Sequence, residues 1–144
     1  RSGAQLTGIE NIAAAGIELV AFIYKDIVLK LGNRALIPTG ILVGIPEGFE
    51  AEIRPRSRLA LKYGVTILNA PGTIDSDYRG EIKVILINLG NMDFTVRNGD
   101  RIAQMVFKNV VRVSWEVVEE LPETKRNKGG FGSTGINKTN HGLL

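Results

Sequence analysis

Hydrophobic and polar residues alternate along much of the chain with a period of two instead of 3.6. Residues 49–54 (Phe-Glu-Ala-Glu-Ile-Arg) show the pattern of a strand with one buried face. Further short apolar or β-branched runs are Val28–Leu31, Leu36–Ile37, Ile41–Ile45, Val65–Leu68, Phe94–Val96 and Val110–Val117. Turn formers such as Asn98-Gly99-Asp100 separate these runs. The pattern predicts an all-β domain, a distorted jelly-roll-like β-barrel.

Two segments depart from this alternation. Residues 82–87 are apolar on both faces apart from Lys83, so burial of both faces is expected. One layer of core rarely covers both sides of a sheet in so small a domain, which favours contact between identical subunits. Residues 57–62 are the best candidate for a short helix, with Ser57 as its N-cap.

The composition fits one domain followed by a short arm. The 144 residues are enough for one core, and residues 1–122 are expected to form it. Residues 123–144 are polar and Gly-rich and are expected to be a flexible arm. From residue 125 onward the arm carries four basic residues and no acid, which suits a phosphate-bearing partner, although composition alone favours a solvated tail.

Several classes of function are disfavoured. Cysteine is absent and His141 is the single histidine, so thiolate metal sites and His-based catalysis are not expected. No apolar run approaches the ~20 residues that cross a bilayer, so no membrane partner is expected. No secretion signal is recognisable, and a cytoplasmic, bacterial-like location is predicted.

Two segments, one basic and one containing glycines, carry polar residues that the core of a β-barrel does not need. Arg54-Pro55-Arg56-Ser57-Arg58 offers guanidinium groups and free N–H groups for an anion; a solvated basic turn is the alternative. Residues 69–81 (Asn-Ala-Pro-Gly-Thr-Ile-Asp-Ser-Asp-Tyr-Arg-Gly-Glu) are predicted to be a long hairpin tip that can read the edge of a base. There Asp75 is a candidate general base and Tyr78 a planar wall. Ordinary turn chemistry is the alternative.

Two later segments complete the candidate chemistry. Arg101 and Gln104 lie three residues apart beside an apolar run and can place a cation and an amide at one pocket edge; an ordinary edge-strand charge is the alternative. Residues 126–135 hold four glycines around Phe131 and Ser133, like a phosphate cradle, although Ile136 follows where a Walker loop needs lysine. Phe131 suggests stacking on a ligand, and a plain Gly/Ser tail is the alternative.

In this order the segments resemble the homotrimeric dUTPase family from about Ala15 to Gly135. Gly72–Glu81 and Gly129–Gly135 are the most specific parts of the resemblance. The resemblance implies hydrolysis of dUTP to dUMP and pyrophosphate by Mg²⁺-assisted water attack at the α-phosphate. That activity keeps uracil out of DNA and supplies dUMP for thymidylate synthesis. It also implies a homotrimer in which three chains contribute to each active site.

The resemblance also implies a role for each candidate residue. Asp75 would activate the water, Tyr78 would pack under deoxyribose, and Phe131 would cover the base. The base pocket would be formed by Asn69, Gly72, Thr73, Ile74 and Lys83. The phosphates would be met by Arg56, Ser57, Arg58, Gln104 and Arg126, with Gly132, Ser133 and Thr134 closing the arm. Arg101 would orient its neighbours, and Glu18 would contact Mg²⁺ indirectly through water.

Two positions depart from the family pattern, and three rival functions stay open. Glu18 stands where the family normally has aspartate, and Arg58 where glycine, or sometimes serine, is usual. A dCTP deaminase needs a proton-shuttling glutamate where this chain has Ile85, which disfavours it. A non-catalytic nucleotide-binding regulator would explain the two departures. A nucleic-acid-binding module is weaker still because the basic residues are scattered and only 6% of residues are aromatic.

Overall fold

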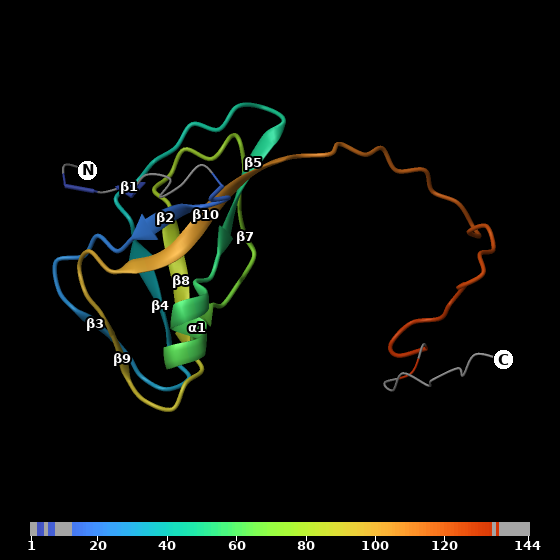
Figure 1. Ribbon diagram of the computed structural model, residues 1–144. Helices are drawn as coiled ribbons and strands as arrows, with labels where there is room; N and C mark the ends of the chain where they lie inside the picture. The colour runs from blue at the N-terminus through green and yellow to red at the C-terminus, as the bar shows by residue number, and fades with distance from the viewer. Residues whose placement is uncertain (1–2, 5, 8–12, 134, 136–144) are drawn as a thin grey trace. The chain divides into compact units, whose positions relative to one another are not determined.

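The computed structural model describes residues 3–4, 6–7, 13–133 and 135, and Figure 1 shows their course. The chain divides into two compact units, Arg1–Arg112 and Val113–Leu144. The first unit therefore ends earlier than residue 122, where the sequence placed the end of the barrel. Within the described ranges, no helix is long and apolar enough to cross a membrane.

The first unit is built from strands and one short helix. In chain order they are β1 Leu6–Thr7, β2 Ile17–Val20, β3 Ile27–Leu29, β4 Arg34–Pro38, β5 Phe49–Arg54, α1 Ser57–Tyr63, β6 Val65–Ile67, β7 Gly72–Ile74, β8 Lys83–Asn88, β9 Phe94–Val96 and β10 Arg101–Asn109. The strands form three antiparallel sheets in the orders β1-β2-β10-β5-β7, β3-β9 and β4-β8-β6. Figure 1 shows β2, β10 and β5 running side by side, with β3 and β9 forming a separate ribbon.

A single apolar core lies between these sheets. Its largest fully buried side chains include Leu19, Ile37, Leu86, Ile102 and Met105, which come from strands of two different sheets. The all-β, jelly-roll-like architecture predicted from the alternation is confirmed. Strand β5 also has the predicted inward face at Ala51 and Ile53, although Phe49 at its start is largely exposed.

Three local expectations were wrong. Residues 41–45 and 110–117 contain no strand; Ile45 is buried in a loop, and the second run is exposed. Ser57 is the first helical residue of α1, because Arg56 is the N-cap, with extended backbone and no side-chain capping bond. Gly64 ends the helix in the left-handed conformation, with φ of 66°, which glycine adopts without steric cost.

The long hairpin predicted around Asp75 is not a hairpin. Strand β7 pairs with β5, whereas β8 pairs with β4 and β6 in a different sheet. Residues 75–82 are therefore a crossover between two sheets, here called the β7–β8 loop. Neighbouring strands in sequence usually pair with each other, which is why the sequence favoured the simpler reading.

Strand β8 only partly meets the prediction that both faces are buried. Val84 and Leu86 are fully buried, whereas Ile85 and Ile87 on the other face are half-buried in the single chain. The outer row across the sheet continues with Leu36, which is opposite Ile85, and with Leu68, whose N–H bonds to the Ile85 carbonyl. These two leucines are 56% and 48% exposed.

Candidate functional site

Four of the predicted site residues lie together near the ends of β2, β5 and β10: Arg56 and Gln104, predicted to contact phosphates, with Glu18 and Arg101. Gln104 on β10 is opposite Glu18 on β2 and opposite Arg54 on β5. Glu18 Oε1 accepts hydrogen bonds from Arg56 Nε at 3.2 Å and Arg56 Nη2 at 3.1 Å. Glu18 Oε2 lies 3.3 Å from Arg101 Nε. We call Glu18, Arg56, Arg101 and Gln104 the Glu18 cluster.

The Glu18 cluster is braced and carries excess positive charge. Arg56 also donates from Nη1 to the Arg101 carbonyl at 3.2 Å, so this guanidinium links two strands. The Arg56 and Glu18 side chains are only 17% and 19% exposed, which strengthens their attraction relative to a surface pair. One carboxylate between two guanidinium groups leaves one positive charge unmatched, and such a fork can bind phosphate oxygens.

Gly16 gives the Gln104 side chain its room. A Cβ at position 16 would lie 3.0 Å from Gln104 Oε1 and 3.3 Å from its Cβ. The glycine therefore allows the amide to lie against the backbone of the segment that leads into β2. The amide of Gln104 is half-buried beside the charged groups, as its predicted role requires.

Arg54, the first arginine of the basic segment, is neutralised within its own strand. Its Nη2 lies 3.1 Å from Glu52 Oε2, and Lys108 Nζ approaches the same oxygen at 3.3 Å. The hydrogen bond that Arg54 donates is the largest cause of a lowered pKa at Glu52; desolvation acts against it, and Lys108 adds to it. Arg56 and Arg58 are thus the arginines of this segment that face the candidate site.

Asp75 lies exposed at the start of the β7–β8 loop. Its carbonyl accepts the Tyr78 N–H at 3.1 Å, which closes a tight turn. Tyr78 Oη donates to the Glu81 carbonyl at 3.0 Å, and Glu81 Oε1 accepts the Gly40 N–H at 2.8 Å. These bonds tie the loop to the segment after β4.

Gly80 sets the position of the Tyr78 ring. A Cβ at position 80 would collide with the Tyr78 hydroxyl and ring carbons. The ring lies over the glycine, and Tyr78 stays 44% exposed. This exposure leaves part of the side chain accessible to a ligand, which the predicted wall role requires.

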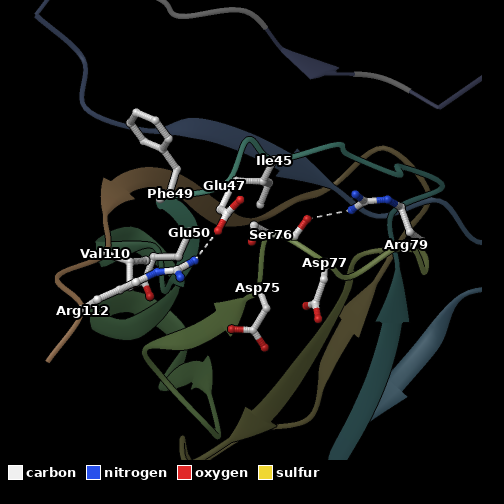
Figure 2. Close-up of a pocket in the computed structure, with 11 residues that line it drawn as sticks. Ile45, Glu47, Phe49, Glu50, Asp75, Ser76, Asp77, Arg79, Val110 and Arg112 are labelled. Atoms are coloured by element: carbon white, nitrogen blue, oxygen red, sulfur yellow. Dashed lines mark hydrogen bonds and ion pairs between the residues drawn. The ribbon is translucent and has the colours of Figure 1, made fainter. Parts of the chain in front are cut away.

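Asp75 also lines a pocket of about 660 Å³, which Figure 2 shows. In that view Asp75 and Asp77 point to the same side, away from the Glu47–Arg112 ion pair, whose atoms are 2.6 Å apart. The Glu18 cluster contributes no residue to this pocket. Its arginines line a second pocket of about 410 Å³, together with Arg58 and Arg97.

The register of β5 shows how far apart these two places are. Ile74 is opposite Ala51, so Asp75 follows at the Glu50 end of β5, whereas Arg54–Arg56 leave the other end. Four strand residues from Glu50 to Arg54 span about 13 Å. A base must reach the attacking water by a direct hydrogen bond or through one further water. Asp75 and Arg56 of one chain are too far apart for one reacting phosphate.

The predicted base-pocket residues bracket β7. Gly72 is buried, and the Asn69 amide lies beside it, 3.4 Å from where a Cβ at position 72 would stand. A cis peptide bond joins Ala70 to Pro71 between them. Thr73 and Lys83 are exposed at the edges, with Ile74 half-buried. The structure thus places Asn69, Gly72 and Thr73 on the segment that leads into Asp75.

The second unit carries the remaining predicted residues on a series of local turns. The Arg126 carbonyl accepts the Gly129 N–H at 2.9 Å, and Arg126 Nε donates to the Gly129 carbonyl at 2.7 Å. Further turns join Gly130 to Ser133 and Gly132 to Gly135. Phe131 is fully exposed at 113%, with φ of 48°, a conformation that is costly for a bulky side chain. Thr134 lies outside the described residues.

Two residues that matter to the site were not singled out from the sequence. Arg97, on the β9–β10 turn, lines the second pocket with the Glu18 cluster. The carboxylate of Glu81 anchors the β7–β8 loop. Their roles depend on contacts with segments more than 30 residues away, and no local pattern distinguishes them from ordinary surface charges.

Glu18, which was predicted to contact Mg²⁺ through water, is paired with arginines in the structure. Both oxygens of Glu18 face arginines. Across the described ranges, no group of three or more His, Cys, Asp or Glu side chains is placed to hold a metal ion. The described side chains therefore do not fit a metal cage made by the protein alone, and they fit a cation that is bound to phosphate oxygens and keeps much of its water.

The barrel combines a guanidinium cluster braced by a carboxylate with an acidic loop flanked by glycines, an arrangement that suits a small all-β protein that binds phosphate groups. The chain belongs to the dUTPase family, whose family model matches residues 4–135. It is 58% identical over 123 residues to the deoxyuridine 5'-triphosphate nucleotidohydrolase of Rickettsia prowazekii (strain Madrid E), covering 85% of this chain and 83% of the relative. The enzyme of that name from Ehrlichia canis (strain Jake) is 56% identical over 125 residues, covering 85% and 82%.

Solved structures agree on the fold. A substituted form of the Staphylococcus bacteriophage 80alpha dUTPase superposes with a TM-score of 0.82 at 23% identity, over 92% of this chain and 93% of that one. Another form of the same phage enzyme, with dUpNHpp, gives a TM-score of 0.80 at 23% identity, over 94% and 95%. The jelly-roll-like barrel described above is therefore the dUTPase fold.

Proposed function

We propose that this chain hydrolyses dUTP to dUMP and pyrophosphate. The observation that carries the proposal is the match to the dUTPase family over residues 4–135, which includes both the β7–β8 loop and the Gly-rich segment. The relatives at 56–58% identity are named for this activity. The fixed position of the Tyr78 ring over Gly80, in the loop that begins at Asp75, supports a nucleotide-reading role for this loop.

The chemistry assigned to Asp75 is general-base catalysis. Its carboxylate takes a proton from a water molecule as the water oxygen bonds to the α-phosphorus. The bond from the α-phosphorus to the bridging oxygen of the β-phosphate breaks, and pyrophosphate leaves. Arg56, Ser57 and Gln104 hold the phosphates, and the excess positive charge of the Glu18 cluster stabilises the charge that develops on the leaving group.

We also propose that the active site is shared between chains of a homotrimer. The separation of about 13 Å along β5 supports this, because Asp75 and Arg56 of one chain cannot serve the same phosphate. The Leu36–Ile85–Leu68 row offers an apolar surface for subunit contact. Residues 111–117 offer another: Val111, Val113, Trp115 and Val117 alternate with polar residues and are 66–97% exposed.

The arm, residues 123–144, is proposed to close a site assembled from other chains. Phe131 would stack on uracil, Arg126 would bind the terminal phosphate, and Gly132, Ser133 and Thr134 would supply hydrogen bonds. Phe131 has a left-handed backbone conformation and an exposed ring. This supports the role, because contact between the ring and a ligand would offset the conformational strain of the backbone. Tyr78 would exclude a ribose 2′-hydroxyl, and the backbone at Asn69 and Gly72–Ile74, with Lys83 nearby, would select uracil.

Magnesium is proposed to enter with the substrate. A triphosphate carries about four negative charges, which a water-excluded pocket tolerates only when cations and N–H dipoles match them. Mg²⁺ supplies part of that compensation while it keeps several waters. A solved phage phi11 dUTPase with the same fold, at a TM-score of 0.73 and 21% identity, is described with a structural Mg(II) ion. A water-mediated contact from Glu18 stays a prediction.

One assay tests the activity against its rivals. Purified protein with Mg²⁺ is given dUTP, dCTP, dTTP and UTP in turn, and pyrophosphate and ammonia are followed. Pyrophosphate from dUTP, with little turnover of the others, is expected. Ammonia from dCTP would indicate a deaminase, which Ile85 disfavours because it cannot shuttle protons. Binding of dUTP without turnover would indicate a regulator.

Light scattering on the same sample should give the mass of three chains; a fully active monomer would contradict the shared active site.

A further inference from the structure

The turn that presents Asp75 lies outside the strand ladders. Pairing between β7 and β5 ends at Ile74, and pairing between β8 and β4 begins at Lys83. One backbone hydrogen bond closes the turn, from the Tyr78 N–H to the Asp75 carbonyl at 3.1 Å. That bond engages the first and the third of the four peptide units between residues 75 and 79. The second and the fourth units need another partner to have a fixed orientation.

The side chain of Arg79 supplies that partner. Its Nη1 donates to the Ser76 carbonyl at 2.7 Å and to the Tyr78 carbonyl at 3.0 Å. These carbonyls belong to the second and the fourth units, so each of the four units has a hydrogen bond. Figure 2 shows the guanidinium reaching back to the Ser76 carbonyl, while the Asp75 carboxylate points to a different side of the turn. Arg79 therefore acts on the backbone of the turn and does not contact the carboxylate.

The charge of Arg79 suits the same turn. Asp75 and Asp77 are two residues apart and point to the same side, so their like charges repel each other. A cation bound to the carbonyls of the turn offsets part of this repulsion. Among the described residues Arg79 forms no ion pair, whereas Arg112, which lines the same pocket, is paired with Glu47 at 2.6 Å. The positive charge of Arg79 is thus not neutralised by a partner elsewhere in the described chain.

We propose that Arg79 is a positioning residue for the base Asp75, an assignment that rests on the proposed function. A carboxylate on a turn with unbound peptide units would sample several directions, and a base works only within hydrogen-bond reach of the attacking water. The two bonds from Arg79 restrict that freedom before the substrate binds. Tyr78 is held in the same way through its carbonyl, and its hydroxyl bonds to the Glu81 carbonyl. The base and the sugar wall are therefore aligned together.

Two substitutions of Arg79 and one control test this role. Arg79→Met keeps an unbranched apolar stem and removes every donor, whereas Arg79→Lys keeps the charge and three donors on a slightly shorter side chain. Lys30→Met is the matched control, because it also removes one exposed positive charge, from the turn between β3 and β4. Calorimetric melting should give all four proteins nearly the same melting temperature. Should Arg79→Met fail to fold, Arg79→Lys carries the same tests with smaller expected changes.

Hydrogen exchange followed by NMR measures the turn without turnover. In Arg79→Met the Tyr78 N–H should exchange several-fold faster than in the wild type, because the turn that it closes opens more often. Arg79→Lys should give an intermediate rate, and Lys30→Met the wild-type rate. The amides of β5 should exchange equally in all four proteins. Equal exchange of the Tyr78 N–H in Arg79→Met and the wild type would overturn the proposal.

Steady-state kinetics with dUTP separates positioning from binding. Arg79→Met should lower kcat by roughly tenfold to a hundredfold, the scale of a misplaced catalytic group, with KM and the affinity for dUpNHpp within a few-fold of wild type. Arg79→Lys should recover part of the lost kcat. A raised KM with unchanged kcat would mean that Arg79 binds the charge of the substrate directly, which would overturn a positioning role.

The two measurements also distinguish this proposal from the proposed function. If the wild type hydrolyses no dUTP but Arg79→Met opens the turn, the proposed function fails and the bracing of the turn by Arg79 stands. If the wild type hydrolyses dUTP and Arg79→Met does so at the same rate, the positioning role fails and the proposed function stands.

Discussion

The Glu18 cluster and the Gly-rich segment around Phe131 are both proposed to hold the phosphates or the base of one nucleotide, but they are built differently. Arg56 in the cluster is braced by Glu18 and by the Arg101 carbonyl, on strands that share one sheet. Among the described residues, the Arg126 side chain in the segment bonds to Gly129, three residues away, and Phe131 is fully exposed. The first arrangement is fixed by the core, whereas the second is held by its own local turns.

The two regions differ in how much conformational entropy they lose when the nucleotide binds. A braced guanidinium loses little conformational entropy when it binds phosphate, so most of its interaction contributes to affinity. Ordering a Gly-rich segment costs about 1–2 kcal/mol of backbone entropy per residue. The segment can be ordered only by several simultaneous contacts with the ligand. We therefore expect the barrel to set basal affinity and the arm to set how completely the site closes.

The largest effect is expected at Asp75, which lies outside both the Glu18 cluster and the Gly-rich segment. Asp75→Asn removes the base while it keeps the size and the turn, so turnover should fall by roughly 10²–10⁴. Affinity for dUpNHpp, measured by calorimetry, should stay within a few-fold of wild type. Turnover near the wild-type rate would remove Asp75 from the mechanism.

The next largest effect should follow deletion of residues 125–144. None of residues 125–133 belongs to the barrel core, so the melting temperature and the trimer mass should be nearly unchanged. Turnover should fall by about 10² because the site no longer excludes water and orients the phosphates. Calorimetric melting, light scattering and the pyrophosphate assay measure the three quantities. A large loss of stability would show that the segment is part of the folded core.

Mixing the two variants tests whether loop and arm meet across chains. Arm-deleted subunits and Asp75→Asn subunits, unfolded and refolded together, should recover part of the activity, because a mixed trimer can assemble one intact loop with one intact arm. Native mass spectrometry must show that mixed trimers form. Absence of recovery in proven mixed trimers would place loop and arm in the same chain.

A smaller effect is expected at the braced region itself. Glu18→Gln leaves two guanidinium groups beside one neutral amide, so Arg56 loses its positioning and the KM for dUTP should rise about tenfold, with kcat less affected. Glu52→Gln is the matched control, because Glu52 also bridges two cations in the same sheet. It should leave KM unchanged. Equal KM values in all three proteins would mean that the brace does not matter for substrate binding.

The next prediction tests whether Tyr78 selects the sugar of the nucleotide, and a still smaller effect is expected. Gly80→Ala places a methyl group where the tyrosine ring lies, so the ring must move and the preference for dUTP over UTP should fall several-fold. Gly44→Ala is the control, since a Cβ there meets nothing within 4 Å. The ratio of kcat/KM for the two nucleotides is the measurement. An unchanged ratio in Gly80→Ala would exclude Tyr78 as the selector of the sugar.

The smallest effect concerns acid stability. Since the folded-state pKa of Glu52 is lowered, its contribution to stability is present above the unfolded pKa and is lost as the pH falls through the folded value. Glu52→Gln should therefore be less stable than wild type near neutral pH and should lose less stability on acidification. Urea unfolding at neutral and acidic pH measures the difference. A constant difference at every pH would exclude the ion pair as its cause.

The sequence predicted most of what is encoded locally. Alternation in residues 49–54 predicted β5, because a strand with one buried face needs period two, and the short apolar run 94–96 predicted β9. The Gly72–Glu81 and Gly129–Gly135 patterns carried the family assignment, since backbone that must approach a base or phosphate requires glycine at fixed positions. The prediction of a strand from Val110 to Val117 was wrong because a strand needs a partner as well as a suitable pattern, and among the described residues no strand pairs with this run.

Only the tertiary structure decided which of the charged residues act together. Glu18, Arg56 and Arg101 are separated by 38 and 45 residues along the chain, and the order β2-β10-β5 brings them into contact. The same order places Asp75 at the far end of β5 and turns the expected hairpin into a crossover between sheets. Local pattern determines which face of a strand is buried, because side-chain alternation is a property of the strand alone. It cannot determine which strands lie side by side, because that choice depends on how distant segments share one core.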